Sequence, residues 1–232
     1  KFIAQFGKGP TVAAAPAAGR GTDTAYAGVS PGRAAGGGRG GRGGRGGRGS
    51  TPALPANSQS TESFGGPAAF SFDADAKEVF VADGYRNHRV AVLDMTTGAV
   101  KRFWGAYGNK PDDADTAKYT PGGTPAKQFG APVLCATLSN DGMVYVSDRG
   151  GKRVQVFTLE GKYVDQGFIG RECKAPECGN GTTAASTAFS ADPAQRFLYV
   201  GNRSQARVMV FDRKTLTLLD SFGQWGSAPG DF

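Results

Sequence analysis

The chain has 232 residues, of which 37 are glycine, and its formal net charge is +7. Residues 1–63 contain eight Lys or Arg and two Asp or Glu, whereas residues 64–232 contain nineteen and eighteen. The positive charge is therefore a property of the N-terminal segment and predicts no basic face on the rest of the chain. No apolar run approaches the roughly 20 residues that span a bilayer, so the sequence predicts no membrane span.

Residues 1–7, KFIAQFG, have the pattern of a short strand that ends in an aromatic residue and a glycine. Similar segments end two of the repeated units described below, so we expect residues 1–7 to be the last strand of a preceding unit. The chain lacks an initiator Met and opens in the middle of a repeat, so we expect it to be a fragment of a larger protein.

Residues 8–63 contain almost no large apolar side chains. Such a segment cannot bury enough apolar area to offset its chain entropy, and we predict a disordered Gly/Ala/Pro/Arg-rich insertion. Within it, the RGG-type tract of residues 36–50 is typical of segments that contact RNA and other polyanions. A flexible, solvated linker is the alternative, because aromatic residues do not alternate with the arginines. The predicted polyanion-binding residues are Arg39, Arg42, Arg45 and Arg48.

The same order of features then occurs three times: VFVADGYRNHRV at 79–90, VYVSDRGGKRV at 144–154 and LYVGNRSQARV at 198–208. Each copy shows the alternation of β-branched residues that is typical of half-buried strands, interrupted by a polar turn. The internal repeat predicts an all-β protein built from four-stranded antiparallel units at 64–106, 129–170 and 187–223.

Asp83, Asp148 and Asn202 stand at the start of the polar turn in each copy. Their short side chains accept hydrogen bonds from the backbone a few residues on, so we interpret them as turn-formers. Rigid units with variable loops are typical of binding proteins, and we expect ligands to contact these turns. The ligand-binding residues predicted there are Arg86, Asn87, His88, Arg149 and Arg203.

Three connecting segments complete the predicted organisation: an irregular loop at 107–128, a loop at 171–186 and a lead-in to a further unit at 224–232. The first loop contains Asp112, Asp113 and Asp115, three oxygen donors of the kind that bind Ca²⁺. The second contains Cys173 and Cys178, close enough in sequence to form a small disulfide in an oxidising compartment. This pair favours an extracytoplasmic location, periplasmic or secreted.

The four-stranded unit, with (V/L)YV-x-D near its second strand, Arg-Val opening the third and an aromatic-Gly closing the fourth, resembles the NHL repeat. The resemblance covers residues 64–232 and the first seven residues. It implies a bacterial-type β-propeller of four-stranded blades, six-bladed when complete, of which about three are present here. An open half ring leaves sheet faces uncovered at both ends.

FVADGYRNHRV at 80–90 also resembles a blade of the peptidyl-hydroxyglycine amidating lyases. That resemblance implies a proton-transfer role for Tyr85, the tyrosine of the DGY turn, beside a zinc held by His residues of neighbouring blades. The chain departs from the pattern at APVLCATL, where the zinc-ligating His after Pro132 is absent. His88, the single histidine, does not match a ligand position, and the other ligands would lie in missing blades.

Three hypotheses follow from these patterns. The preferred one is a non-enzymatic NHL propeller that binds a protein, glycan or small ligand at its loop face. The second is a zinc-dependent lyase centred on Tyr85, a carbon-nitrogen lyase if the chain is an enzyme. The third is an RNA or polyanion binder that uses the RGG tract. No cofactor is assigned, and zinc or calcium is expected only in the complete propeller.

Overall fold

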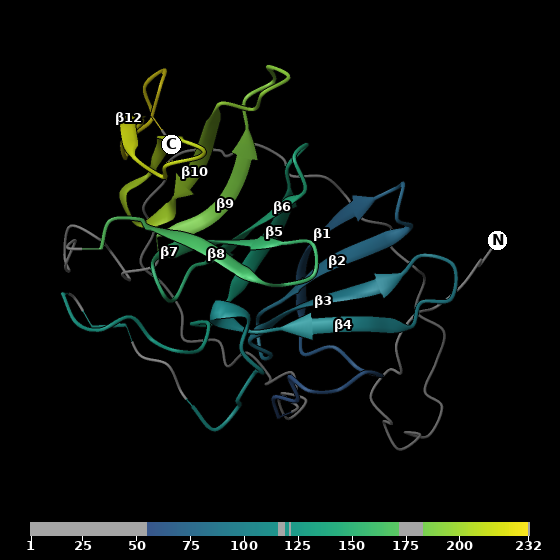
Figure 1. Cartoon of the computed structure of the whole chain (residues 1–232). Coiled ribbons are helices and arrows are strands. Elements are labelled where there is room, and N and C mark those ends of the chain that lie inside the picture. The colour runs from purple at the N-terminus through teal and green to yellow at the C-terminus, as the bar shows by residue number, and fades with distance from the viewer. Residues whose placement is uncertain (1–54, 116–118, 121, 172–182, 232) are drawn as a thin grey trace, which may run out of the picture. The chain divides into compact units, whose positions relative to one another are not determined.

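The structure is a computed structural model that describes residues 55–115, 119–120, 122–171 and 183–231, and its regular structure is almost entirely β. Twelve strands form three antiparallel sheets of four strands each, in which neighbours in sequence are neighbours in the sheet (Figure 1). The first sheet contains β1 (Pro67–Asp73), β2 (Glu78–Asp83), β3 (Arg89–Asp94) and β4 (Val100–Trp104). The second contains β5 (Val133–Leu138), β6 (Met143–Asp148), β7 (Arg153–Thr158) and β8 (Tyr163–Phe168). The third contains β9 (Ala184–Phe189), β10 (Phe197–Asn202), β11 (Arg207–Asp212) and β12 (Leu218–Phe222).

The turns between the third and fourth strands show how local sequence sets the meander. Asp94 Oδ1 accepts backbone N–H groups of Thr96 and Thr97 at 2.9 and 2.7 Å. Gly98 then adopts a φ of 72°, a conformation that glycine reaches without steric cost. The turn at Asp212 repeats this arrangement with different residues. Each turn folds on its own side-chain hydrogen bonds, so the strands pair in a fixed register.

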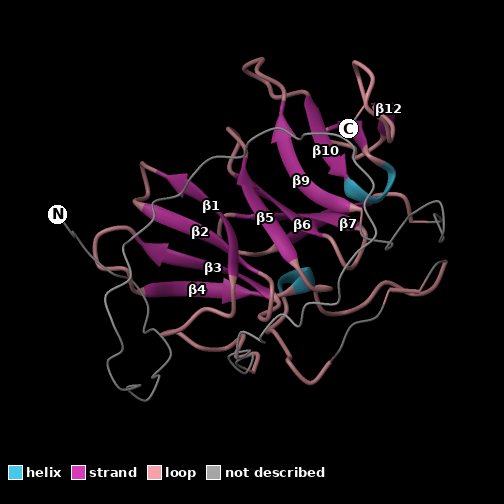
Figure 2. Ribbon diagram, turned by 180° about the vertical axis from the view of Figure 1, so that it is seen from behind, coloured by secondary structure: helices cyan, strands magenta, loops and turns pink. Residues whose placement is uncertain are grey.

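The first strands of the three sheets are neighbours in turn, because β1 contacts β5 and β5 contacts β9 (Figure 2). The sheets therefore pack face to face with their first strands innermost, which is the arrangement of blades in a β-propeller. This confirms the all-β propeller fold predicted from the repeat.

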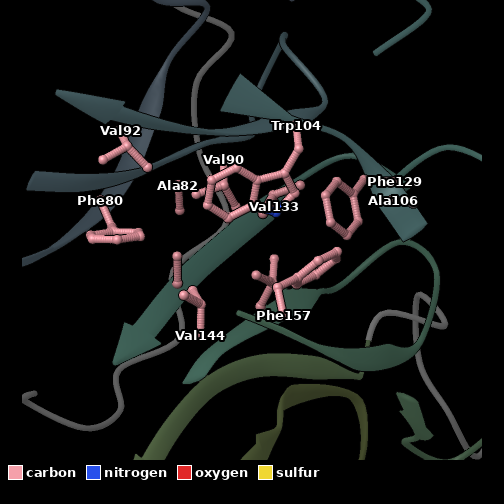
Figure 3. Packing of buried hydrophobic residues seen from close by; sticks show 12 residues of the cluster. Phe80, Ala82, Val90, Val92, Trp104, Ala106, Phe129, Val133, Val144 and Phe157 are labelled. Carbon is pink, nitrogen blue, oxygen red and sulfur yellow. The ribbon is translucent and has the colours of Figure 1, made fainter. Parts of the chain in front are cut away.

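The first core lies between the first and second sheets (Figure 3). The Trp104 ring centroid lies 6.3 Å from that of Phe80 and 5.9 Å from that of Phe157. Gly161, with a φ of 86°, passes so close to Trp104 that an added Cβ would lie 2.5 Å from the indole. Burial of each large side chain here contributes about 1.5–3 kcal/mol, so this interface dominates the cohesion of the two blades.

A polar clasp closes the same interface. The Arg102 guanidinium donates to both carboxylate oxygens of Glu78, at 2.8 and 2.6 Å, and to the Leu159 carbonyl of the second sheet at 2.8 Å. Hydrogen bonding from Arg102 lowers the pKa of Glu78 to about 2. The ionised form of Glu78 is thus favoured by Arg102, a residue of the same sheet, and Arg102 in turn connects the two sheets through the Leu159 carbonyl.

The second core lies between the second and third sheets and includes Tyr145, Val156, Leu198 and Phe211. Arg213, which is 3% exposed, crosses this interface and donates to both carboxylate oxygens of Asp141 at 2.8 and 2.9 Å. Charged hydrogen bonds at the rim thus accompany apolar packing at both interfaces between sheets.

Two boundaries differ from the sequence prediction. Residues 55–63, predicted to belong to the insertion, lie against the first sheet, where Ser58 is fully buried. The first strand of the third sheet begins at Ala184 rather than at residue 187, because Ala184 pairs with Asn202. The predicted strand at 1–7 and the remainder of the insertion lie outside the described residues. Within the described part, no helix has the length and apolar character needed to cross a bilayer.

Candidate ligand-binding face

The turns that join the two middle strands of each sheet are the predicted binding loops, and we call them the middle turns. They comprise residues 84–88, 149–152 and 203–206. Strand pairing places the residue before each turn directly opposite the Arg that follows it: Asp83 with Arg89, Asp148 with Arg153 and Asn202 with Arg207. Every middle turn therefore begins and ends at a pair of polar residues that face each other at the ends of the two middle strands.

In the first sheet this pair is a fully buried ion pair. Asp83 Oδ2 accepts Arg89 Nε at 2.9 Å, and both side chains are 0% exposed. The other carboxylate oxygen, Oδ1, accepts the backbone N–H of Gly65 at 2.8 Å. Asp83 thus ties the entry to β1 to the first middle turn, which goes beyond the turn-forming role predicted from sequence.

The Arg89 guanidinium also donates hydrogen bonds to the backbone that precedes the sheet. Nη1 donates to the carbonyls of Ser58 and Ser60 at 3.0 and 2.5 Å, and Nη2 donates to that of Ser63 at 2.8 Å. These bonds explain why residues 58–63 lie on the blade although their composition resembles the insertion: their carbonyls, rather than their side chains, are the groups that bind.

The second sheet repeats the arrangement. Asp148 Oδ2 accepts Arg153 Nε at 2.8 Å, and Oδ1 accepts the backbone N–H groups of Gly130 and Gly151, both at 2.9 Å. Burial raises the pKa of the Asp148 carboxyl, and the Arg153 charge opposes that rise. The third sheet departs from the pattern, since neutral Asn202 donates to Gln205 Oε1 at 2.7 Å and Arg207 is exposed.

Three of the predicted residues occupy equivalent positions. The backbone N–H groups of Tyr85, Arg149 and Arg203 donate to the carbonyls that lead into the first strands, those of Gly66, Pro132 and Thr183, each at 3.2 Å. Tyr85 is 59% exposed, Arg203 is exposed and Arg149 is half-buried. Because the first strands are innermost neighbours, these three side chains lie on the same end of successive blades.

The remaining predicted residues divide into exposed and structural ones. Arg86 is exposed and free to meet a ligand. Asn87, which was predicted to contact a ligand, is 1% exposed, and its amide donates to Asp83 Oδ2 at 2.7 Å, so its side chain stabilises the base of the turn. His88 is half-buried, and its Nδ1 donates to the Phe129 carbonyl at 2.7 Å. That bond joins the first middle turn to the segment entering the second sheet, so His88 acts as a structural link.

The loop that contains Asp112, Asp113 and Asp115 does not form a metal-binding site. Asp113 accepts the backbone N–H of Ser58 at 2.8 Å, and Asp112 accepts that of Ala114 at 2.9 Å. Among the described residues, no group of three His, Cys, Asp or Glu side chains is placed to hold a metal ion. The calcium prediction for Asp112, Asp113 and Asp115 is therefore not supported: the carboxylates cap the local backbone instead.

Two basic residues of this face were missed by the sequence analysis. Lys152 is 4% exposed, and its ammonium lies 4.5 Å from the centroid of the Tyr119 ring. Arg171 lies 4.3 Å from the Phe168 ring centroid and donates to the Gly123 carbonyl. No signal in the sequence marked Lys152, because Tyr119 is distant in sequence, whereas Phe168 stands three residues before Arg171 and could have indicated that pair. Cys173, Cys178 and the four arginines of the RGG tract lie outside the described residues.

Neither a scan against protein-family models nor a search of curated proteins finds a match for this chain. Among solved structures, the chain is similar to Kuenenia stuttgartiensis hydrazine synthase, with a TM-score of 0.48 and 13% identity over 73% of this chain and 38% of that one. It is also similar to U3-55K, with a TM-score of 0.45 and 14% identity over 67% of this chain and 38% of that one. A third similar structure is the Myceliophteria thermophila Cps50 (Swd1) β-propeller domain, with a TM-score of 0.44 and 10% identity over 67% of this chain and 40% of that domain. The chain spans less than half the length of each of these proteins.

Proposed function

We propose that this chain is a binding module of the NHL-repeat type that holds an acidic ligand, such as an acidic segment of a protein, against its middle turns. The observation that carries the proposal is the equivalent placement of Tyr85, Arg149 and Arg203 on successive blades. An aromatic ring and two guanidinium groups supply apolar contact and paired donors for carboxylates.

The charge of the middle turns supports an acidic ligand. Residues 84–88, 149–152 and 203–206 contain Arg86, Arg149, Lys152 and Arg203 but no Asp or Glu. The acidic residues at their bases, Asp83 and Asp148, are buried and paired with arginines. Lys152 is 4% exposed, so Arg86, Arg149 and Arg203 are the groups that offer positive charge to a ligand at these turns, which favours anions and accelerates their association.

The anchoring of the turns supports binding as well. Their bases are held by buried hydrogen bonds, so less conformational entropy is lost when a ligand is bound than for a free loop. The exposed side chains can then vary without changing the fold, which is how propeller loops acquire ligands.

The first test uses a fluorescent oligoglutamate peptide and a chain that lacks residues 36–50, so that the RGG tract does not contribute. We expect saturable binding that weakens with added salt, and no binding of an oligolysine peptide of the same length. Absence of oligoglutamate binding would overturn the proposal. Binding that is present only in the intact chain would instead assign polyanion recognition to the tract.

The lyase hypothesis comes from the sequence resemblance of residues 80–90, and one structural observation favours it, the 59% exposure of Tyr85 on this face. His88 is committed to the Phe129 carbonyl, and the described residues do not assemble a metal-binding group. The residues present do not fit the zinc site of that enzyme class. Turnover of a peptidyl-hydroxyglycine substrate that is lost in Tyr85→Phe would nevertheless establish the activity.

A further inference from the structure

The face of the first sheet that points away from the second sheet is open and apolar. It forms a groove of about 520 Å³ whose lining includes Phe64, Phe70, Phe72 and Met95. Phe70 is 58% exposed, Phe72 63% and Met95 41%. Such a cluster of exposed large side chains on one sheet face is typical of a surface that packs against another protein element.

The repeat identifies what kind of element packs there. In each sheet, one cross-strand row joins the first, second and third strands at the same register. The three equivalent rows are Phe72, Val79 and Leu93; Leu138, Val144 and Phe157; and Phe189, Leu198 and Phe211.

In two of the three sheets this row is covered by the preceding sheet. Val144 and Phe157 are both 0% exposed in the first core, and Leu198 and Phe211 are 1% and 3% exposed in the second core. In the first sheet, by contrast, Phe72 is 63% exposed and Val79 is half-buried, whereas Leu93, which also lines the groove, is 6% exposed. The open groove is therefore the same docking surface that receives a blade twice elsewhere in the chain.

The residues of each sheet that pack on the row of the next sheet also repeat. Phe80 pairs with Val92 in the first sheet and Tyr145 pairs with Val156 in the second, and both pairs lie in the cores between sheets. The equivalent pair in the third sheet is Tyr199 with Val210, and both residues are only half-buried. Beside them, on β12, Phe222 is 51% exposed. The third sheet thus has the same kind of face that, in the first and second sheets, packs on the next sheet. In the described part of the chain, no next sheet covers it.

We infer that a second copy of this chain packs its third sheet onto the open face of the first sheet. Each copy carries both complementary faces, so two copies form two such contacts, related by a two-fold axis. Propellers contain roughly 4–8 blades, and two copies of three sheets give six, whereas three copies would exceed that range. The inference is independent of the proposed function, since it concerns the faces between blades and not the middle turns.

The test is the mass of the full chain in solution, measured by sedimentation velocity at micromolar concentrations. We expect a species of twice the 24.0 kDa of one chain. Phe72→Asp and Val210→Asp, which place a charge on the first and third sheets respectively, each lose dimerisation alone. Val164→Asp is the matched control, because Val164 is 51% exposed on β8 of the middle sheet and its variant should remain dimeric.

Mixing distinguishes this arrangement from other dimers. The Phe72→Asp chain keeps an intact third sheet and the Val210→Asp chain keeps an intact first sheet, so the mixture regains one contact and forms a heterodimer. A wild-type chain that sediments only as a monomer overturns the inference. So does a Val210→Asp chain that still dimerises, because first sheets would then pack on each other. Circular dichroism of each variant verifies that the strands are retained.

Discussion

Replacement of Arg89 by methionine tests the role of the buried ion pair at the base of the first middle turn. Arg89 is 0% exposed and donates to the Asp83 carboxylate and to the carbonyls of Ser58, Ser60 and Ser63. Methionine fills part of the volume but leaves these acceptors without their donor. Removing one partner of a buried ion pair costs about 3–5 kcal/mol of unfolding free energy, and we expect a loss in that range.

The chain contains its own control. Arg207 stands at the same position of the third repeat, opposite Asn202, but is exposed to solvent. Arg207→Met should change the unfolding free energy by no more than about 0.5 kcal/mol, as is usual for surface positions. The two substitutions are chemically identical, so the difference between them measures the environment of the guanidinium.

Urea unfolding followed by tryptophan fluorescence gives both values. Trp104 is 3% exposed in the first core, whereas Trp225 is 69% exposed, so a Trp225→Phe background leaves only the core indole as a reporter. Equal losses for Arg89→Met and Arg207→Met would refute the reasoning. A partial recovery in the double variant Asp83→Leu/Arg89→Met would support it, because the unpaired buried carboxylate is then removed as well.

Three further outcomes are expected. Glu78 has a pKa of about 2 in the folded chain against an ordinary 4.5. Its contribution to the free energy of unfolding, up to about 3 kcal/mol, is therefore present above pH 4.5 and lost as pH falls through 2. Glu78→Gln should reduce the pH dependence of unfolding in that window, and an unchanged pH profile would contradict the assignment. Gly84→Ala places a Cβ 2.1 Å from a backbone carbonyl oxygen of β5 and should cost about 1–3 kcal/mol or more, measured as a lower melting temperature. We propose an extracytoplasmic location, and in that oxidising compartment non-reducing peptide mapping should find Cys173 joined to Cys178; two free thiols would remove the support that this pair gives to the location.

The strands and their order could be predicted because the sequence repeats its hydrophobic alternation three times, each time with an Asp or Asn before a polar turn and an Arg after it. Each of β2, β6 and β10 was expected from one run of apolar, β-branched and aromatic residues, and their pairing followed from short polar turns. The start of β9 was not visible, because AASTAF contains small residues that give no strong strand signal. Its pairing with β10 supplies what its own composition lacks.

The binding role of the site residues stays a prediction, whereas their positions in the fold can be compared with the structure. Arg149 and Arg203 were predicted to bind a ligand and Tyr85 to act in catalysis; the backbone N–H groups of all three lie at equivalent points of successive turns. Asp83 was interpreted as a turn-former because side-chain preferences alone do not show a partner six residues on. The regular appearance of an Arg after each turn was the available signal, and strand register turns it into an ion pair. The nearly balanced charge of residues 64–232 also gave no indication that the middle turns are basic, because it is a sum over the whole region.

The measurement that tests the proposed binding face most directly is the affinity of the labelled oligoglutamate peptide for single-arginine variants of the chain without residues 36–50. Arg149→Ala and Arg203→Ala should each weaken binding several-fold at low salt. Arg196→Ala should not, because that arginine is exposed like Arg203 but lies in the turn between β9 and β10, at the other end of the blades. Equal weakening by all three substitutions would reduce the interaction to net charge and contradict a site at the middle turns.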